Sequence, residues 1–229
     1  MSINIALIDS GVNPSHFHVR EIEKGLCFYL NSESRVVQGD DFTDITGHGT
    51  AIAGVIKQKA SFARLYAVKI FFENLRAPAQ ALMAALKWAI YNNMKIIHLS
   101  LGIKQKKHEK CLKELCDQAY EKGVVIVAAA RRLNDNLFPS AFENVIGVYR
   151  NHECGENTIF YHPGSSVEFG AYGSPRPLPG LPQKLNFSGS SFAAAHVTGK
   201  VAQLLKNNPD ANMLQVKDML IKNSLQYPV

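Results

Sequence analysis

Three short segments of the sequence carry side chains suited to acid, base and nucleophile chemistry. Asp9 ends the apolar run in "LIDSGVN", His48 lies among small residues in "TGHGTAIAGVI", and Ser191 lies in "NFSGSSFAAAHVTGK". Taken singly, each has an ordinary explanation: strand-end aspartates also occur in nucleotide and phosphoryl-transfer sites, lone histidines are more often structural, and serine is a common helix N-cap. The small residues around Ser191 let backbone N–H groups approach the hydroxyl at a helix start, where developing negative charge is favoured.

The elements that must position these segments follow from an alternation of strand and helix patterns. Near-continuous apolar runs predict strands, and apolar residues at helical spacing predict the helices between them. This alternation indicates an α/β fold with a mostly parallel central sheet and helices on both faces. The proline- and glycine-rich stretch 173–183 predicts an ordered surface loop. The predicted strands are 3–8, 63–71, 95–102, 123–130 and 143–150, and the predicted helices are 78–93, 109–122, about 190–206 and 212–224.

The carboxyl ends of these strands are where a sheet of this kind binds its ligands. Asp9 follows the first predicted strand, residues 100–102 end the third, and Arg131 and Arg132 follow the fourth. We therefore expect the chemistry at this edge of the sheet.

Length and composition limit the class of protein. The 229 residues, 46% of them hydrophobic, are enough for one domain with a substantial core, and no linker divides residues 1–229. No run of about 18 apolar residues predicts a membrane span. The chain starts directly with a strand-like segment and lacks a signal peptide, so we expect a cytoplasmic protein.

The cysteine spacing, the charge pattern and the motifs argue against metal, nucleic-acid and dinucleotide binding. Cys27, Cys111, Cys116 and Cys154 show no CxxC spacing and no histidine at metal-ligand spacing, so we expect reduced thiols and no metal site. The net charge is +6, but the basic stretch 104–110 has no interleaved aromatic residues, so no nucleic-acid partner is expected. No GxGxxG follows the first strand, which argues against a dinucleotide site.

Taken together and in this order, the three segments resemble the subtilisin-like serine peptidases, the subtilases. The family patterns D-[ST]-G, H-G-T and G-T-S-x-A, the last followed by x-x-H-V and a glycine, match "DSG", "HGT" and "GSSFAAAHVTG". The segments "ARLYAVKIF", "LKWAIYNNMKIIHLSLG", "KGVVIVAAA" and "NVIGV" also look like core segments of the family, in the same order. The resemblance spans about residues 3–224 and implies the three-layer subtilisin-like fold.

The resemblance implies acyl transfer by a catalytic triad. Ser191 would attack the scissile carbonyl, and His48 would take and return the proton. Asp9 would hold the imidazole tautomer and stabilise its charged form. His196 matches a structural position in the family.

The resemblance also implies how substrate would bind. Ser100, Leu101 and Gly102 look like the family's edge segment, which pairs with extended substrate through backbone hydrogen bonds. Ala129 and Ala130, in the alanine run 128–130, would line the first specificity pocket.

The chain departs from the family where the side-chain donor of the oxyanion hole is expected. Subtilases follow the alanine run with Gly-Asn, whereas Arg131 and Arg132 stand here. Several alternatives remain open: the second arginine donates its own N–H groups, a shifted loop brings in an asparagine, the side-chain donor is missing, or both arginines face solvent. The candidate donors are therefore Arg132, Asn134, Asn136, the Ser190 hydroxyl and the Ser191 backbone N–H.

Two further departures concern charge and deletions. Arg131 or Arg132 would place positive charge near the first specificity pocket and favour an acidic or otherwise special residue there. Only "KQKAS" joins the histidine helix to the next strand, so we expect no tight calcium site and no other cofactor. We also expect no N-terminal arm and no propeptide.

The leading hypothesis is a cytoplasmic serine endopeptidase of narrow specificity that processes a precursor or leader peptide. Its expected partners are a peptide or protein substrate and, in addition, a propeptide-like or partner protein. The alternative is a pseudopeptidase that acts as a peptide-binding or regulatory module, which the missing asparagine favours and the intact triad disfavours.

Overall fold

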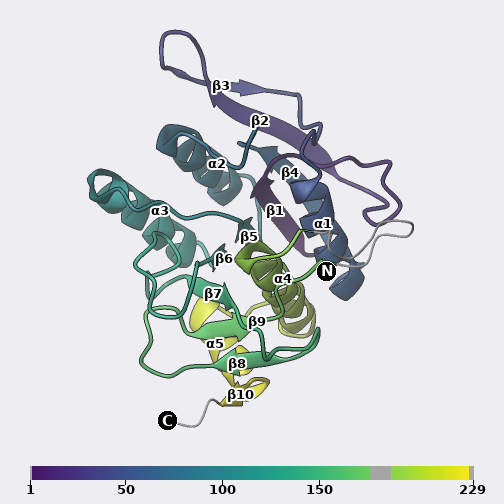
Figure 1. Ribbon diagram of the computed structural model, residues 1–229, viewed down its shortest axis with the longest axis vertical. Coiled ribbons are helices and arrows are strands. Elements are labelled where there is room, and N and C mark those ends of the chain that lie inside the picture. The colour runs from purple at the N-terminus through teal and green to yellow at the C-terminus, as the bar shows by residue number, and fades with distance from the viewer. Residues whose placement is uncertain (1, 176–186, 227–229) are drawn as a thin grey trace.

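A ten-stranded, mostly parallel sheet forms the centre of the molecule (Figure 1). The computed structural model describes residues 2–175 and 187–226. Within these residues the strand order is β10-β8-β9-β7-β6-β5-β1-β4-β2-β3, in which the β2–β3 and β8–β9 pairs are antiparallel and the other pairs are parallel. The strands are β1 (Asn4–Asp9), β2 (Lys24–Leu30), β3 (Val36–Gly39), β4 (Arg64–Lys69), β5 (Ile96–Leu99), β6 (Val125–Ala129), β7 (Ile146–Arg150), β8 (Ile159–Tyr161), β9 (Phe169–Ala171) and β10 (Leu225–Gln226).

Helices cover both faces of this sheet, which gives the three-layer α/β fold predicted from the sequence. One apolar cluster joins the sheet to α1 (His48–Lys59), α4 (Ser190–Asn207) and α5 (Met213–Lys222). The other joins the opposite face to α2 (Ala79–Tyr91) and α3 (Glu109–Glu121). A short 3-10 turn, η1 (Lys106–His108), precedes α3. Because both faces are covered, the central strands β1, β5 and β6 are mostly apolar, with Asp9 and His98 as buried polar exceptions.

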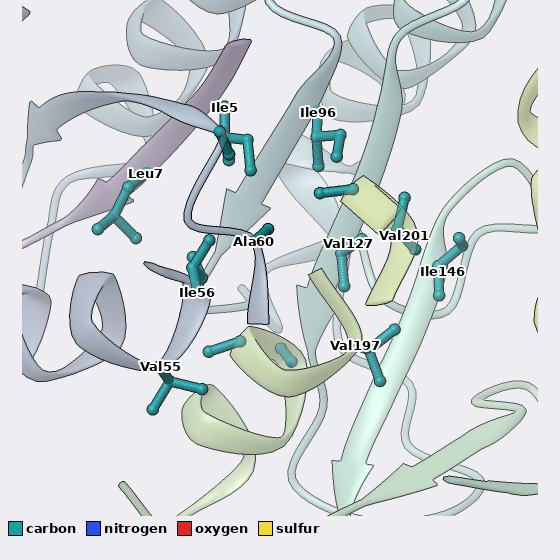
Figure 2. Close-up of a cluster of buried hydrophobic side chains, with 14 of the residues drawn as sticks. Ile5, Leu7, Val55, Ile56, Ala60, Ile96, Val127, Ile146, Val197 and Val201 are labelled. Atoms are coloured by element: carbon teal, nitrogen blue, oxygen red, sulfur yellow. The ribbon is translucent and has the colours of Figure 1, made fainter. Parts of the chain in front are cut away.

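The packing of α1 and α4 on the sheet forms the first of these clusters. Figure 2 shows Val55 and Ile56 of α1 close to the α4 helix that carries Val197 and Val201, beneath strand side chains such as Ile5. All of these side chains are almost completely buried. The start of each helix, which carries His48 or Ser191, is therefore anchored by its own apolar face.

The neighbouring strands β6, β5 and β1 bring the predicted chemistry to one edge. β1 pairs in parallel with β5, and β5 pairs in parallel with β6. Asp9 is the last residue of β1, Ser100 follows β5 and Ala130 follows β6. Parallel strands end on the same side, so these residues share the carboxyl edge of the sheet.

Every strand and helix predicted from the sequence is present, with ends shifted by a few residues. The patterns missed the hairpin of β2 and β3 and the short strands β8, β9 and β10. Most of the predicted surface loop 173–183 lies outside the described residues.

Replacement of Ile56 by alanine tests the packing of α1. Ile56 is fully buried against the sheet, so Ile56→Ala should lower the free energy of unfolding by about 2–5 kcal/mol, measured by chemical denaturation. Ile45 is 66% exposed, so Ile45→Ala should change the free energy of unfolding by no more than about 0.5 kcal/mol. Equal effects of the two variants would contradict this packing.

Candidate active site

A buried carboxylate–imidazole pair lies at the end of β1. Asp9 Oδ1 is 2.7 Å from His48 Nδ1 and also accepts the Ser10 backbone N–H at 2.7 Å. Asp9 is 0% exposed and His48 is 5% exposed. A carboxylate only accepts hydrogen bonds, so Asp9 fixes the imidazole proton on Nδ1 and leaves Nε2 as a base.

The pair shifts the pKa of each partner toward its charged form. Burial alone would raise the pKa of Asp9, but the charge and hydrogen bond of His48 lower it below its ordinary value. Burial alone would lower the pKa of His48, but the charge and hydrogen bond of Asp9 raise it, with a further contribution from Asp44. The imidazole is therefore a stronger base than an ordinary histidine.

Asp44 holds the start of α1, although the sequence analysis did not single it out. Its carboxylate, in a residue only 4% exposed, accepts the backbone N–H groups of Gly47 at 2.9 Å and Thr50 at 2.8 Å. It also accepts the Thr50 hydroxyl at 2.6 Å and the Ser10 hydroxyl at 2.9 Å. The carboxylate thus satisfies free N–H groups of the helix and ties the turn after β1 to the turn before His48.

Close backbone approach explains the glycine that follows the histidine. Gly49 donates its N–H to Ser10 Oγ at 2.9 Å. A Cβ at position 49 would lie 2.1 Å from the carbonyl oxygen of Gly11 and 3.2 Å from Asp9 Oδ1. Only glycine lets α1 come this close to the end of β1.

Ser191 lies in the first turn of α4. Gly189 precedes the helix with φ of 147°, a conformation that favours glycine. Ser191 Oγ donates to the backbone carbonyl of Ser100 at 3.2 Å. In the described part of the chain no hydrogen bond joins Ser191 to His48. Within the described residues the backbone N–H groups of Ser190 and Ser191 form no hydrogen bond, whereas those of Phe192 and Ala193 bond to the Gly189 carbonyl at 3.1 Å and 3.4 Å. Unpaired N–H groups at a helix start favour negative charge nearby.

Two phenylalanines border the imidazole. Phe187 and Phe192 meet His48 edge-on, with ring centroids 5.7 Å and 5.5 Å from it, and stack on each other at 6.4 Å. Phe192 is buried directly after Ser191, whereas Phe187 is 39% exposed. The rings connect α4 to His48 and limit the access of water to it.

A cleft of about 840 Å³ adjoins the nucleophile. The residues predicted to bind substrate line it, and none of the backbone N–H and C=O groups of Leu101 and Gly102 forms a hydrogen bond within the described residues. These groups are therefore available to an extended peptide. The lining residues are Leu75, Arg76, Ser100, Leu101, Gly102, Lys104, Ala129, Ala130, Arg131, Leu137, Ser190 and Ser191.

The loop after β6 is closed by an arginine–aspartate pair. Asp135, 2% exposed, accepts from Arg131 Nη2 at 2.8 Å and Nε at 3.1 Å, and from its backbone N–H at 2.9 Å. The hydrogen bonds from Arg131 hold the pKa of Asp135 below its usual value. Of the two arginines, only Arg131 lines the cleft, and its guanidinium is directed to Asp135.

Only some of the predicted oxyanion donors lie beside the cleft. Arg132, Asn134 and Asn136 are exposed and are not among the residues that line the cleft. Ser190 lines it, and its hydroxyl oxygen accepts the Arg150 backbone N–H at 3.1 Å, which leaves its own proton free to donate. Of the alternatives drawn from the sequence, the arrangement favours a hole built from the first turn of α4.

A second buried histidine was also missed by the sequence analysis. His98, 0% exposed, contacts the Thr198 hydroxyl through Nδ1 at 2.9 Å and the Ser100 hydroxyl through Nε2 at 3.1 Å. It connects β5 to the helix that carries Ser191. Burial lowers the pKa of His98 to about 4, so it is neutral near pH 7. The apolar strand pattern around it gave no sign of this role.

The described residues outside this site show no second arrangement suited to thiol or metal chemistry. All four cysteines are free, and burial raises the pKa of Cys116 to about 12 and of Cys154 to about 11. Among the described residues, no group of three or more His, Cys, Asp or Glu side chains is arranged to hold a metal ion. Across the same residues, no helix combines the length and the apolar character needed to cross a membrane.

Comparison with known proteins assigns this arrangement to a family. The sequence model of the subtilase family, Peptidase_S8, matches residues 2–228. The chain belongs to the subtilase family. The match covers both the acid–base pair and the serine, in agreement with the resemblance found in the sequence.

Relatives of this subtilase include two proteins of Bacillus subtilis. The minor extracellular protease Epr of Bacillus subtilis (strain 168) is 32% identical over 235 residues, which are 97% of this chain and 35% of that protein. Subtilisin E of the same strain is 29% identical over 236 residues, 96% of this chain and 59% of that protein. The chain thus spans less than two thirds of the length of either relative.

Solved structures confirm the fold of the subtilase. The crystal structure of a cold adapted subtilisin-like serine proteinase matches with a TM-score of 0.73 and 22% identity, over 96% of this chain and 81% of that chain. At this level of identity the likeness concerns the fold alone.

Removal of the Asp44 carboxylate should destabilise the subtilase. Asp44→Ala leaves several buried donors without an acceptor, so we expect the free energy of unfolding to fall by about 3 kcal/mol, measured by chemical denaturation. Asp40 is exposed and forms no hydrogen bond in the described residues. Asp40→Ala should therefore change the free energy of unfolding by less than about 0.5 kcal/mol. A near-neutral Asp44→Ala would show that this carboxylate does not hold α1.

Protonation of His98 should weaken the fold in acid. Its pKa is about 4 in the folded chain against an ordinary 6.5. The stability due to neutral His98 is therefore complete above pH 6.5 and is lost as pH falls toward 4, by about 3 kcal/mol. Unfolding measured between about pH 7 and pH 4 should have a smaller pH dependence in His98→Gln than in the unchanged protein. Identical pH dependence in both would exclude His98 as the responsible group.

Proposed function

We propose that this subtilase is a serine endopeptidase that hydrolyses peptide bonds through an acyl-enzyme. The observation that carries the proposal is the buried 2.7 Å contact between Asp9 and His48, beside a helix start that presents Ser191. An imidazole held with its proton on Nδ1 and its Nε2 free is suited to accept a proton from a serine hydroxyl.

The chemistry requires one rearrangement of the nucleophile. Ser191 Oγ donates to the Ser100 carbonyl, and it would turn toward His48 Nε2 when peptide enters the cleft. His48 then takes the hydroxyl proton while Oγ bonds to the scissile carbonyl carbon. The same proton passes to the departing amine, and water attacks the acyl-enzyme by the reverse proton route, which releases the acid and regenerates Ser191.

The first turn of α4 supports the oxyanion in this proposal. The Ser191 backbone N–H and the Ser190 hydroxyl are donors beside the cleft, and the helix dipole adds favourable charge. A side-chain amide donor in such a hole contributes about 100- to 1000-fold to turnover. An enzyme without that donor is expected to be slow, which suits the processing of one precursor or leader peptide better than general digestion.

The unpaired backbone groups of Leu101 and Gly102 support a peptide or protein as the substrate. We further propose action in the cytoplasm, supported by four free cysteines. A propeptide-like or partner protein and the absence of a tight calcium site remain part of the proposal.

A pseudopeptidase that binds peptides without cutting them is the second candidate. It is favoured by the hydrogen bond of Ser191 Oγ to the Ser100 carbonyl instead of to His48, and by the loop after β6, where Arg131 pairs with Asp135. In that case the cleft would still bind extended peptide.

A fluorophosphonate probe, which labels activated serines covalently, distinguishes the two functions. The unchanged protein should be labelled on Ser191, as located by mass spectrometry, and His48→Ala should be labelled about 10⁴-fold more slowly. Ser191→Ala should not be labelled, and Ser61→Ala, a variant at an exposed serine, should behave as the unchanged protein. Folded protein that remains unlabelled would contradict the peptidase proposal and favour the binding module.

A further inference from the structure

The cleft beside Ser191 has a one-sided charge. Its charged lining residues are Arg76, Lys104 and Arg131, and no aspartate or glutamate among the described residues lines it. These charges give the cleft a positive potential, which attracts negatively charged groups.

The pair with Asp135 accounts for one of these cations. Arg131 is held by two side-chain hydrogen bonds to that buried carboxylate, so its charge is largely balanced. The sequence analysis expected Arg131 or Arg132 to place positive charge near the specificity pocket. Arg132 does not line the cleft, and Arg131 lines it with its charge paired to Asp135.

Arg76 and Lys104 carry the unbalanced charge. Both are exposed, and neither forms an ion pair or a hydrogen bond with any residue that the structure describes. Glu73, in the same loop as Arg76, is not among the lining residues. The stretch 176–186 contains no aspartate or glutamate in its sequence.

The two cations come from separate segments that meet at the cleft. Arg76 lies in the loop between β4 and α2, whereas Lys104 follows the segment of Leu101 and Gly102, whose backbone groups are unpaired. A peptide paired with that segment would pass close to both side chains. Carboxylates on it would replace water around the two cations and gain hydrogen bonds to charged donors.

We infer that the substrate is an acidic peptide, with aspartate or glutamate side chains in the part that lies along Leu101 and Gly102, and that Arg76 and Lys104 determine this specificity. The inference rests on the proposed function only for the cutting step, because the same charges would select the peptide in a binding module. Recognition of this kind acts between exposed charges and weakens as salt is added.

Binding and cleavage of matched peptides test the inference separately. A positional set of peptides, each with glutamate or glutamine at one position, is measured for binding to Ser191→Ala by fluorescence anisotropy and for cleavage by the unchanged protein. At least one position should favour glutamate about fivefold at about 0.05 M salt and less than about twofold at about 1 M salt. Arg76→Gln combined with Lys104→Gln should remove this preference, and Arg76→Glu combined with Lys104→Glu should reverse it.

The control variant makes the same change in net charge elsewhere. Lys24→Gln combined with Lys222→Gln alters two exposed lysines that do not line the cleft, and it should keep the full preference for glutamate. Binding without any preference, or a preference that survives removal of Arg76 and Lys104, would overturn the inference. If binding shows the preference but the fluorophosphonate does not label Ser191, the inference stands and the peptidase function fails.

Discussion

The hydrogen bond between Asp9 and His48 is the interaction on which the rest of the site depends. A fully buried carboxylate is costly unless a charge or hydrogen bond compensates it, and His48 and the Ser10 backbone N–H supply that compensation. The bond forms only because β1 ends where α1 begins, and Asp44 and the absence of a side chain at Gly49 bring those two ends together. The acid–base pair is therefore a product of the fold rather than of the two residues alone.

The nucleophile is positioned by helix α4 and by the end of strand β5. Ser191 begins the helix that packs against α1 in the core, and its hydroxyl contacts the Ser100 carbonyl at the end of β5. His98 joins the Ser100 side chain to Thr198 further along that helix. Two neighbouring strand ends and two packed helices thus hold the three predicted catalytic side chains. Only a rotation of the Ser191 side chain toward His48 separates the observed arrangement from the one that the proposed reaction needs.

The sequence was sufficient for the parts of the site that lie in local motifs. Asp9, His48 and Ser191 stand in short segments with small neighbours, and long apolar runs predicted the strands that carry them. Asp44 was missed because its effect comes from folding the chain back onto N–H groups, which no periodicity reveals. The Arg131–Asp135 pair was missed for a similar reason, because the conformation of a loop depends on which side chains close it. The sequence alone therefore could not decide which residue of this loop would donate to the oxyanion. The hairpin of β2 and β3 and the three-residue strands β8 and β9 were too short or too irregular for pattern recognition.

An NMR titration of the histidine side chains, labelled with nitrogen-15, tests the central claim most directly. If Asp9 holds His48 as described, Nδ1 of His48 keeps its proton throughout, and Nε2 titrates with a pKa above the ordinary 6.5. The same signal in Asp9→Asn should titrate at a lower pKa, because the compensating charge is gone. A His48 signal that titrates at or below 6.5 in the unchanged protein, or that is insensitive to Asp9→Asn, would contradict the account.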